Sequence, residues 1–358
     1  MRARARPLIA LAVALALGGW LLAARPAHPP VPPPQPQAQT PAPQAVAQRP
    51  TTIPARLADG SAFTPQFYPD AATAIGTVRT PDATAERLVL RRDGVERELR
   101  RVPVERYPQF LGFTAADGVL YWAESTATTA GPWETRMWKA SLDGGAPVSL
   151  TTDAGAAVFF DSQFDLVVAE GRLHWIAAPP DDSDSTELRS VAIGGGGGKV
   201  TVDSFPGRYR WTTWPWLQSA DVQSGPVELV DRTTGQRRTV AATAAETLGC
   251  TPAWCRSVAP TASGNLFQVL RADGADRRRI PGEVNAVTVD VGLMDRYEVL
   301  TELADEKVRV LAYDLRDGTM KVLAADVGVV GARGPVVFWS TGATAPEAWN
   351  ALDLRTLP

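Results

Sequence analysis

The sequence predicts an all-β fold, a seven-bladed β-propeller with six blades as the alternative, and repeated turns carry this prediction. From residue 60 onward, short runs of Val, Leu, Trp, Tyr and Thr alternate with Gly and Asp turns, without sustained helical periodicity. Six of these turns read as hairpins, and they centre on Gly94, Gly144, 194–198, Gly235, Gly274 and Gly318. A repeating all-β unit of roughly 40–50 residues is typical of propeller blades.

A second set of glycines recurs at a similar spacing and gives the number of units. Its members are Gly76, Gly118, Gly171, Gly207, Gly249, Gly292 and Gly334. These markers indicate seven units. There are only six hairpins, because the sequence ends soon after the third strand of the last unit. We therefore expect a segment within residues 51–70 to supply the outer strand of the last blade and close the ring.

Within a unit, a second strand follows the marker glycine, a third strand precedes the hairpin, and a polar fourth strand follows it. The expected second strands are 119–125, 172–178, 208–214, 253–259, 295–303 and 335–341. The expected third strands are 136–142, 187–193, 226–232, 266–272, 308–314 and 347–353. Trp122, Trp175 and Trp211 each lie four residues after a marker glycine. We expect all three to be buried between blades.

The units LRADGADRR (270–278) and YDLRDGTMKVL (313–323) show the strand–turn–strand pattern most clearly. With them, residues 60–358 resemble exported bacterial β-propellers, broadly the TolB-like and quinoprotein-like repeat families. The resemblance implies an extracytoplasmic scaffold that binds partners, and it brings no catalytic residues with it.

The N-terminal region predicts export. A cationic head (1–7) precedes the apolar run 8–24, so residues 1–24 are a signal peptide or an uncleaved signal anchor. Residues 25–55 are rich in Pro and Gln and predict a disordered linker, with the propeller domain at 56–358. In both cases everything from residue 25 lies outside the membrane, in a secreted or membrane-anchored protein. Membrane contact is then limited to the N-terminal segment.

Composition excludes several classes of site. The net charge of −3 offers no basic field for nucleic acid. The chain has two histidines, His28 in the linker and His174 within an expected strand, and no Gly-x-Ser-x-Gly motif. His174 is expected in the core, and no catalytic or zinc-binding set can be named. The glycine run before Lys199 lacks the Ser or Thr of a phosphate loop and reads as a slack hairpin.

Two short segments remain, one a candidate calcium site and the other a candidate disulfide. Asp181, Asp182, Asp184 and Glu187 fall in one loop, which is either a solvated acidic loop or a calcium site; we expect no other cofactor. Cys250 and Cys255 predict a disulfide in an exported chain, with free thiols and metal binding as the alternatives.

Three tryptophans are the candidate binding residues. Pro215 is expected to end a second strand, which places Trp214 and Trp216 at the loop joining the second and third strands. In a propeller these loops share one rim, here named the long-loop rim, with the blade-to-blade connections; the DG hairpins occupy the opposite, hairpin rim. The segments 124–134 with Trp133, 181–187 and 303–307 fall on the same long-loop rim. The tryptophans form either an exposed binding patch there or local packing.

The sequence therefore favours a non-catalytic extracytoplasmic propeller that binds a protein, peptide or cell-envelope glycan through its long-loop rim. The alternative is a propeller enzyme, a hydrolase or lyase that uses rim or channel carboxylates. A third interpretation is a structural head on a spacer. Carboxylates that converge in the central channel would favour the enzyme.

Overall fold

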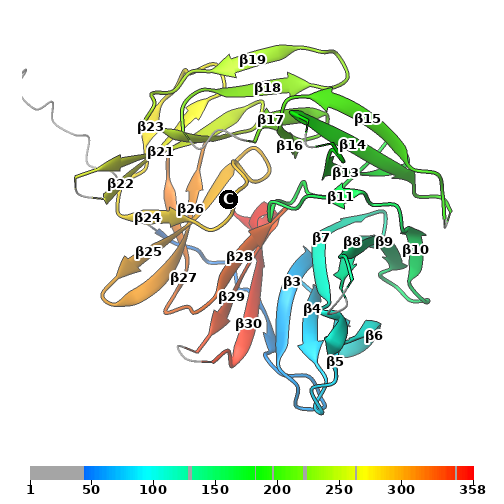
Figure 1. Ribbon diagram of the computed structural model, residues 1–358. Helices are drawn as coiled ribbons and strands as arrows, with labels where there is room; N and C mark the ends of the chain where they lie inside the picture. The colour runs from blue at the N-terminus through cyan, green and yellow to red at the C-terminus, as the bar shows by residue number, and fades with distance from the viewer. Residues whose placement is uncertain are drawn as a thin grey trace, which may run out of the picture. The chain divides into compact units, whose positions relative to one another are not determined.

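A computed structural model describes residues 44–127, 131–181, 183–195, 197–220, 224–262, 264–342 and 345–358. The described strands form seven sheets that follow one another in chain order around a central axis (Figure 1). The expected export segment 1–24 and residues 25–43 of the expected linker lie outside this part of the chain. Within the described ranges, no helix is long and apolar enough to cross a membrane.

The first three blades run from residue 63 to residue 206. Blade 1 contains β3 (Phe63–Asp70), β4 (Thr73–Arg79), β5 (Ala85–Arg92) and β6 (Val95–Pro103), and the one-turn 3-10 helix η1 (Val104–Arg106) follows it. Blade 2 contains β7 (Gln109–Ala116), β8 (Val119–Thr126), β9 (Glu134–Ser141) and β10 (Val148–Thr151). In blade 3 the inner strand is divided into β11 (Ala156–Ala157) and β12 (Val167–Ala169), followed by β13 (Arg172–Ala178), β14 (Ser185–Ala192) and β15 (Thr201–Pro206).

The remaining blades complete the ring. Blade 4 contains β16 (Tyr209–Thr213), β17 (Trp216–Ser219), β18 (Val227–Asp231) and β19 (Arg237–Val240). Blade 5 contains β20 (Thr247–Cys250), β21 (Trp254–Thr261), β22 (Gly264–Arg271) and β23 (Arg278–Arg279). Blade 6 contains β24 (Val284–Ala286), β25 (Tyr297–Ala304), β26 (Lys307–Asp314) and β27 (Met320–Ala325). Blade 7 contains β28 (Val330–Arg333), β29 (Val336–Thr341) and β30 (Ala348–Asp353), and the 3-10 helix η2 (Leu354–Thr356) follows β30.

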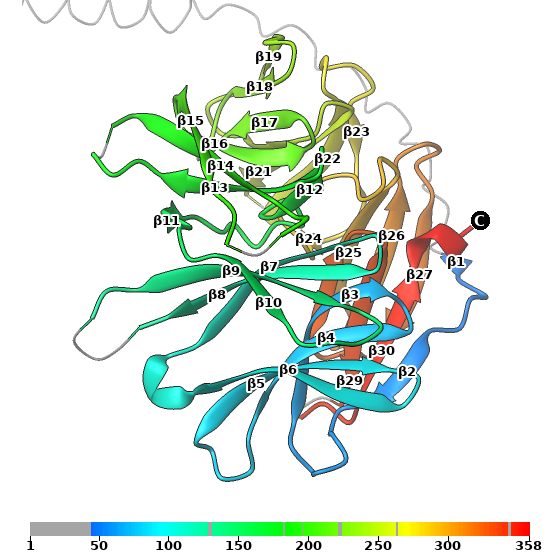
Figure 2. The same ribbon diagram turned by 90° about the vertical axis from the view of Figure 1, so that its right-hand side faces the viewer.

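The outer strand of blade 7 comes from the other end of the chain. β2 (Thr51–Pro54) pairs antiparallel with β30, with Thr52 opposite Asn350 and Ile53 opposite Trp349 (Figure 2). This confirms the expected ring closure from residues 51–70. A second pairing was not expected: β1 (Gln44–Ala45) adds in parallel to β27 of blade 6. The sheets of the propeller therefore begin before residue 56, inside the segment that composition alone assigns to the linker.

The predicted hairpins match the structure of the repeat better than the marker glycines do. All six predicted hairpins join a third to a fourth strand, which confirms the all-β fold with seven blades. Gly118, Gly171, Gly292 and Gly334 lie at positive φ between first and second strands. Gly76 instead lies inside β4, where an added Cβ would stand 2.5 Å from the carbonyl oxygen of Thr64. Gly207 and Gly249 also lie outside such turns, between β15 and β16 and within β20.

Blade 4 corrects one strand assignment. The segment 208–214, expected to be a second strand, contains β16, which is the first strand of its blade and pairs with β17 across a turn at Trp214–Pro215. Trp211 therefore lies on an inner strand and is not equivalent to Trp122 and Trp175 on β8 and β13. All three are nevertheless buried, with exposed fractions of 3%, 0% and 0%. The prediction failed because Pro215, which has no N–H to donate, ends the first strand of the blade, whereas we expected it to end the second.

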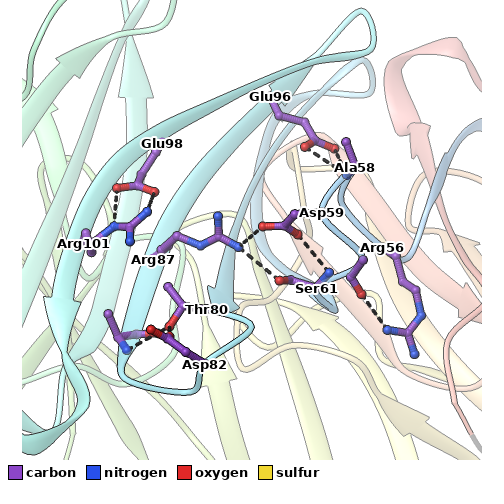
Figure 3. A network of polar contacts seen from close by, with 12 residues as sticks. Arg56, Ala58, Asp59, Ser61, Thr80, Asp82, Arg87, Glu96, Glu98 and Arg101 are labelled. Carbon is purple, nitrogen blue, oxygen red and sulfur yellow. Dashed lines mark hydrogen bonds and ion pairs between the residues drawn. The ribbon is translucent and has the colours of Figure 1, made fainter.

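Polar contacts fasten the segment between β2 and β3 to blade 1. Arg87 on β5 donates to Asp59 at 2.8 Å, and the backbone N–H of Ala58 donates to Glu96 on β6 at 3.2 Å (Figure 3). On the same outer strand Glu98 accepts two hydrogen bonds from Arg101, at 2.9 and 2.8 Å. The contacts of Asp59 and Ala58 orient the incoming chain at the boundary between blade 7 and blade 1, where the ring closes.

Cys250 and Cys255 form the predicted disulfide, which joins directly opposed positions of β20 and β21 in blade 5. Both residues are buried, with exposed fractions of 2% and 0%. Because the closed loop is short, replacing both cysteines by alanine should lower the free energy of unfolding by only about 2 kcal/mol. Urea denaturation should show one cooperative transition at a lower midpoint. Loss of the folded baseline in the double variant would contradict this expectation.

Candidate functional site

A pocket opens on the long-loop rim between blades 3 and 4. Its volume is about 240 Å³, and its floor is apolar, formed by Val158, Phe160, Ile176 and Tyr209. Its edge is polar and contains Ser183, Ser185 and Arg208. We name it the rim pocket. A small set of polar groups around an apolar floor is the usual composition of a binding site.

Hydrogen bonds hold the walls of the rim pocket in place. The hydroxyl of Thr186 on β14 donates to the carbonyl of Gly207 at 2.8 Å and accepts from the N–H of Tyr209 at 2.9 Å. The hydroxyl of Tyr209 donates to the carboxylate of Glu228, and burial raises the pKa of this phenol. The side chain of Tyr209 is therefore uncharged and held in one position where it lines the pocket. The pocket is formed before any ligand arrives, which limits the entropy lost on binding.

The structure does not bring the three candidate tryptophans together. Trp133 lies in the loop between β8 and β9, on the long-loop rim, and is 54% exposed. Trp214 and Trp216 are partly buried and flank the β16–β17 turn, on the hairpin rim. The ring of Trp214 packs against those of His174 and Trp211, with ring centroids 4.4 Å and 5.2 Å apart. The expected position of Trp214 and Trp216 on the long-loop rim was wrong, because their turn joins the first strand to the second.

His174 belongs to the core, as predicted. Its side chain lies on β13 with 7% of the residue exposed, and a ring nitrogen lies 3.3 Å from the carbonyl oxygen of Ala169. Burial lowers its pKa to about 4, so the imidazole is neutral at physiological pH. The neutral imidazole packs against Trp214, which in turn packs against Trp211, so His174 has a packing role.

The acidic loop directs its carboxylates to separate partners. Asp181 accepts from the N–H of Ser183 at 3.2 Å, Asp184 lies 3.5 Å from Arg208, and Glu187 pairs with Arg189 at 2.7 Å. Asp182 lies outside the described residues. Among those described, no group of three or more His, Cys, Asp and Glu residues is placed to hold a metal ion. The loop instead forms one edge of the rim pocket.

A segment that was not predicted from the sequence enters the central channel. Residues 158–166, the channel segment, leave blade 3 between β11 and β12 and run toward the middle of the ring (Figure 1). The hydroxyl of Ser162 donates to Asp290 of blade 6 at 2.5 Å, and the N–H of Gln163 donates to the same carboxylate at 2.7 Å. The side-chain oxygen of Gln163 accepts from the N–H of Gly334 in blade 7 at 3.0 Å. The segment thus ties three blades together across the channel.

Buried charges support this segment. Asp165, 5% exposed, accepts from the backbone N–H groups of Phe160 and Ser162 at 2.9 and 3.0 Å. Arg256 pairs with Glu298 at 2.9 Å. It also donates to the backbone carbonyls of residues 288–290, and so holds the backbone of Asp290 in place. Carboxylates therefore do converge in the channel, since Asp165 and Asp290 both contact Ser162. Each of them accepts donors of the channel segment, so the geometry gives both a positioning role.

Burial raises the pKa of Asp165 to about 6, with a smaller contribution from the nearby Asp290. A carboxyl of the unfolded chain titrates near 4, so the folded state holds this proton more tightly. Folding is therefore favoured at low pH by this group, and that stabilisation is lost as the pH rises from about 4 to about 6. The difference in free energy of unfolding between wild type and Asp165→Asn should fall over that interval. Urea denaturation at a series of pH values measures it, and a difference that rises would contradict the assignment.

The comparisons with known proteins bear on the fold. No protein-family model matches the chain, and no curated protein matches its sequence. It is similar to the solved structure of a Mycobacterium tuberculosis puromycin-hydrolyzing peptidase, with a TM-score of 0.52 and 16% identity over 87% of this chain and 56% of that one. It is also similar to a prolyl endopeptidase, with a TM-score of 0.50 and 15% identity over 84% of this chain and 48% of that one.

A putative TolB from Agrobacterium tumefaciens is a more distant match, with a TM-score of 0.40 and 12% identity over 72% of this chain and 94% of that one. The chain spans about half the length of the two peptidases it matches. At these identities the likeness shows the fold alone, and the chain is a seven-bladed β-propeller.

Proposed function

We propose that this propeller is a non-catalytic binding protein that takes a protein or peptide through its long-loop rim, outside the cytoplasm. The observation that carries the proposal is the rim pocket, with its apolar floor and polar edge. Its volume of about 240 Å³ is below the roughly 300–1,000 Å³ of sites for drug-sized ligands. A single apolar side chain of a partner fits such a space better than a whole ligand does.

The edge of the pocket suits a peptide backbone. The exposed Ser183 and the partly buried Ser185 offer hydroxyl groups, and the Arg208–Asp184 pair stands beside them. Trp133 on the neighbouring blade 2 offers a second apolar anchor on the same rim. Anchors of this kind, surrounded by polar contacts, dominate the energetics of protein interfaces.

A peptide is favoured over a glycan, and binding over catalysis. Sugar recognition uses open aromatic faces. Trp133 is exposed on the long-loop rim but does not line the rim pocket, and the indole of Trp214 packs against His174 and Trp211. A hydrolase or lyase would need reactive carboxylates, whereas Asp165 and Asp290 accept hydrogen bonds from the channel segment. The activities of the similar peptidases belong to those proteins, of which this chain spans about half the length.

Selection from a phage-displayed peptide library tests the proposal, with the full chain in mild detergent as the target. We expect enriched peptides to share a large apolar residue. Ala178→Trp, at an exposed position that lines the pocket, should weaken their binding by about tenfold or more. Ala245→Trp is the matched control, because Ala245 is exposed in the β19–β20 connection of the same rim. No enrichment, or equal loss with both variants, would contradict the proposal.

A further inference from the structure

We propose that the central channel contains a second binding site, for a small zwitterion of the α-amino acid class with an apolar side chain. The site is a cavity of about 220 Å³ formed by blades 1, 2 and 7 and the channel segment. We name it the channel cavity. The residues that carry the argument are Phe110, Phe113, Phe159, Asp161, Asp165 and Arg333. The rim pocket shares none of them, so this inference does not depend on the proposed function.

Arg333 supplies the positive group. Its side chain is 11% exposed; one terminal nitrogen lies 3.2 Å from a carboxylate oxygen of Asp161 and the other lies 3.5 Å from the carbonyl oxygen of Phe113. A guanidinium has five N–H donors, so these two contacts leave donors for a carboxylate. The side chain of Asp161 is 96% exposed, and exposed pairs of this kind are weak. A ligand carboxylate can therefore share or replace this contact.

Asp165 supplies the negative group. Each of its oxygens accepts one backbone N–H, from Phe160 and from Ser162. An ionised carboxylate has about four acceptor positions, so two remain for an ammonium group. Asp165 is 5% exposed, and charge-assisted hydrogen bonds gain strength where water is excluded. One guanidinium and one carboxylate in the same cavity match the two charges of an amino acid.

Aromatic side chains supply the walls. Phe110 and Phe113 lie on β7 and are buried, with exposed fractions of 6% and 3%. Phe159 of the channel segment packs over Gly112, where an added Cβ would stand 2.8 Å from the ring. Gly112, at a φ of 56°, thus allows the third wall to close against β7. The apolar surface favours an aliphatic or aromatic side chain, and the volume excludes an extended peptide.

Calorimetry on the full chain in mild detergent tests this inference, first with each of the twenty amino acids. We expect an apolar amino acid such as leucine to bind. Leucinamide, which lacks the carboxylate, and N-acetylleucine, which lacks the ammonium, should each bind more weakly by about tenfold or more. Absence of binding by every amino acid, or equal affinities for leucine and both analogues, would overturn the proposal even without any variant.

Variants then assign the two ends of the ligand. Arg333→Gln should abolish the preference for leucine over leucinamide while leaving the preference over N-acetylleucine. Arg232→Gln is the matched control, since Arg232 also pairs with an aspartate, Asp203, but on the outer part of the propeller. Ala178→Trp should leave leucine binding unchanged, which separates this site from the rim pocket. Retained discrimination in Arg333→Gln, or loss in Arg232→Gln, would contradict the assignment.

Discussion

Replacing Trp349 by alanine is expected to lower the free energy of unfolding by about 3–5 kcal/mol, as truncation of a buried aromatic side chain does. Trp349 lies on β30, opposite Ile53 of the closing strand β2, and is 2% exposed. Its indole N–H donates to the carbonyl of Phe63 at 2.9 Å, so it joins blade 7 to blade 1. It packs in one cluster with Phe63, Tyr68 and Phe338. The substitution removes this packing at the point where the ring closes.

Urea denaturation followed by circular dichroism measures the effect, and two variants frame it. Trp349→Phe keeps most of the packing and loses the hydrogen bond, so its cost should be nearer about 1–2 kcal/mol. Trp133→Ala removes an exposed indole and should change stability by about 0.5 kcal/mol or less. If Trp349→Ala costs no more than Trp133→Ala, blade 7 is not joined to blade 1 in the way described.

Replacing Glu298 by alanine should cost a similar amount, about 3–5 kcal/mol, because it leaves a buried arginine without its counter-charge. Glu298 is 1% exposed, and its oxygens accept from Arg256 at 2.9 Å and from the N–H of Gly292 at 2.6 Å. Arg256 in turn holds the carbonyls of residues 288–290. The variant therefore also loosens Asp290, which anchors the channel segment.

Asp326→Ala is the matched control for this effect. Asp326 pairs with Lys307 at 2.8 Å, but both side chains are exposed, by 64% and 58%. Its removal should cost about 1 kcal/mol or less. Equal costs for the two substitutions in chemical denaturation would show that the Arg256–Glu298 pair is not the support of the channel that the structure indicates.

The sequence predicted those parts of the fold that depend on local patterns. The DG and TG hairpins, such as those at Gly274 and Gly318, place φ-permissive residues between strand-like flanks, and each of them formed. The closing strand could be inferred because the last blade lacked a partner for β30. The disulfide could be predicted because the two cysteines lie five residues apart in a chain that its N-terminal sequence predicts to be exported.

The features that escaped prediction depend on contacts distant in the sequence. The channel segment is fixed by bonds such as that from Ser162 to Asp290, 128 residues away, and no local pattern encodes them. Blade 4 was misread because Trp211 mimics the spacing of Trp122 and Trp175, while Pro215 turns the chain between a first and a second strand. The floor of the rim pocket could not be predicted either, because Phe160 and Tyr209 are distant in the sequence and meet only where neighbouring blades pack together.

Site-specific photo-crosslinking tests the central claim, that the long-loop rim is the binding face. A benzophenone side chain replaces Ser183 at the edge of the rim pocket or Val95 on the hairpin rim, both of them exposed positions. A library-selected peptide is then added and the full chain is irradiated. The account predicts crosslinks from position 183 and none from position 95. Crosslinks from position 95 alone would contradict it and would move the binding face to the hairpin rim.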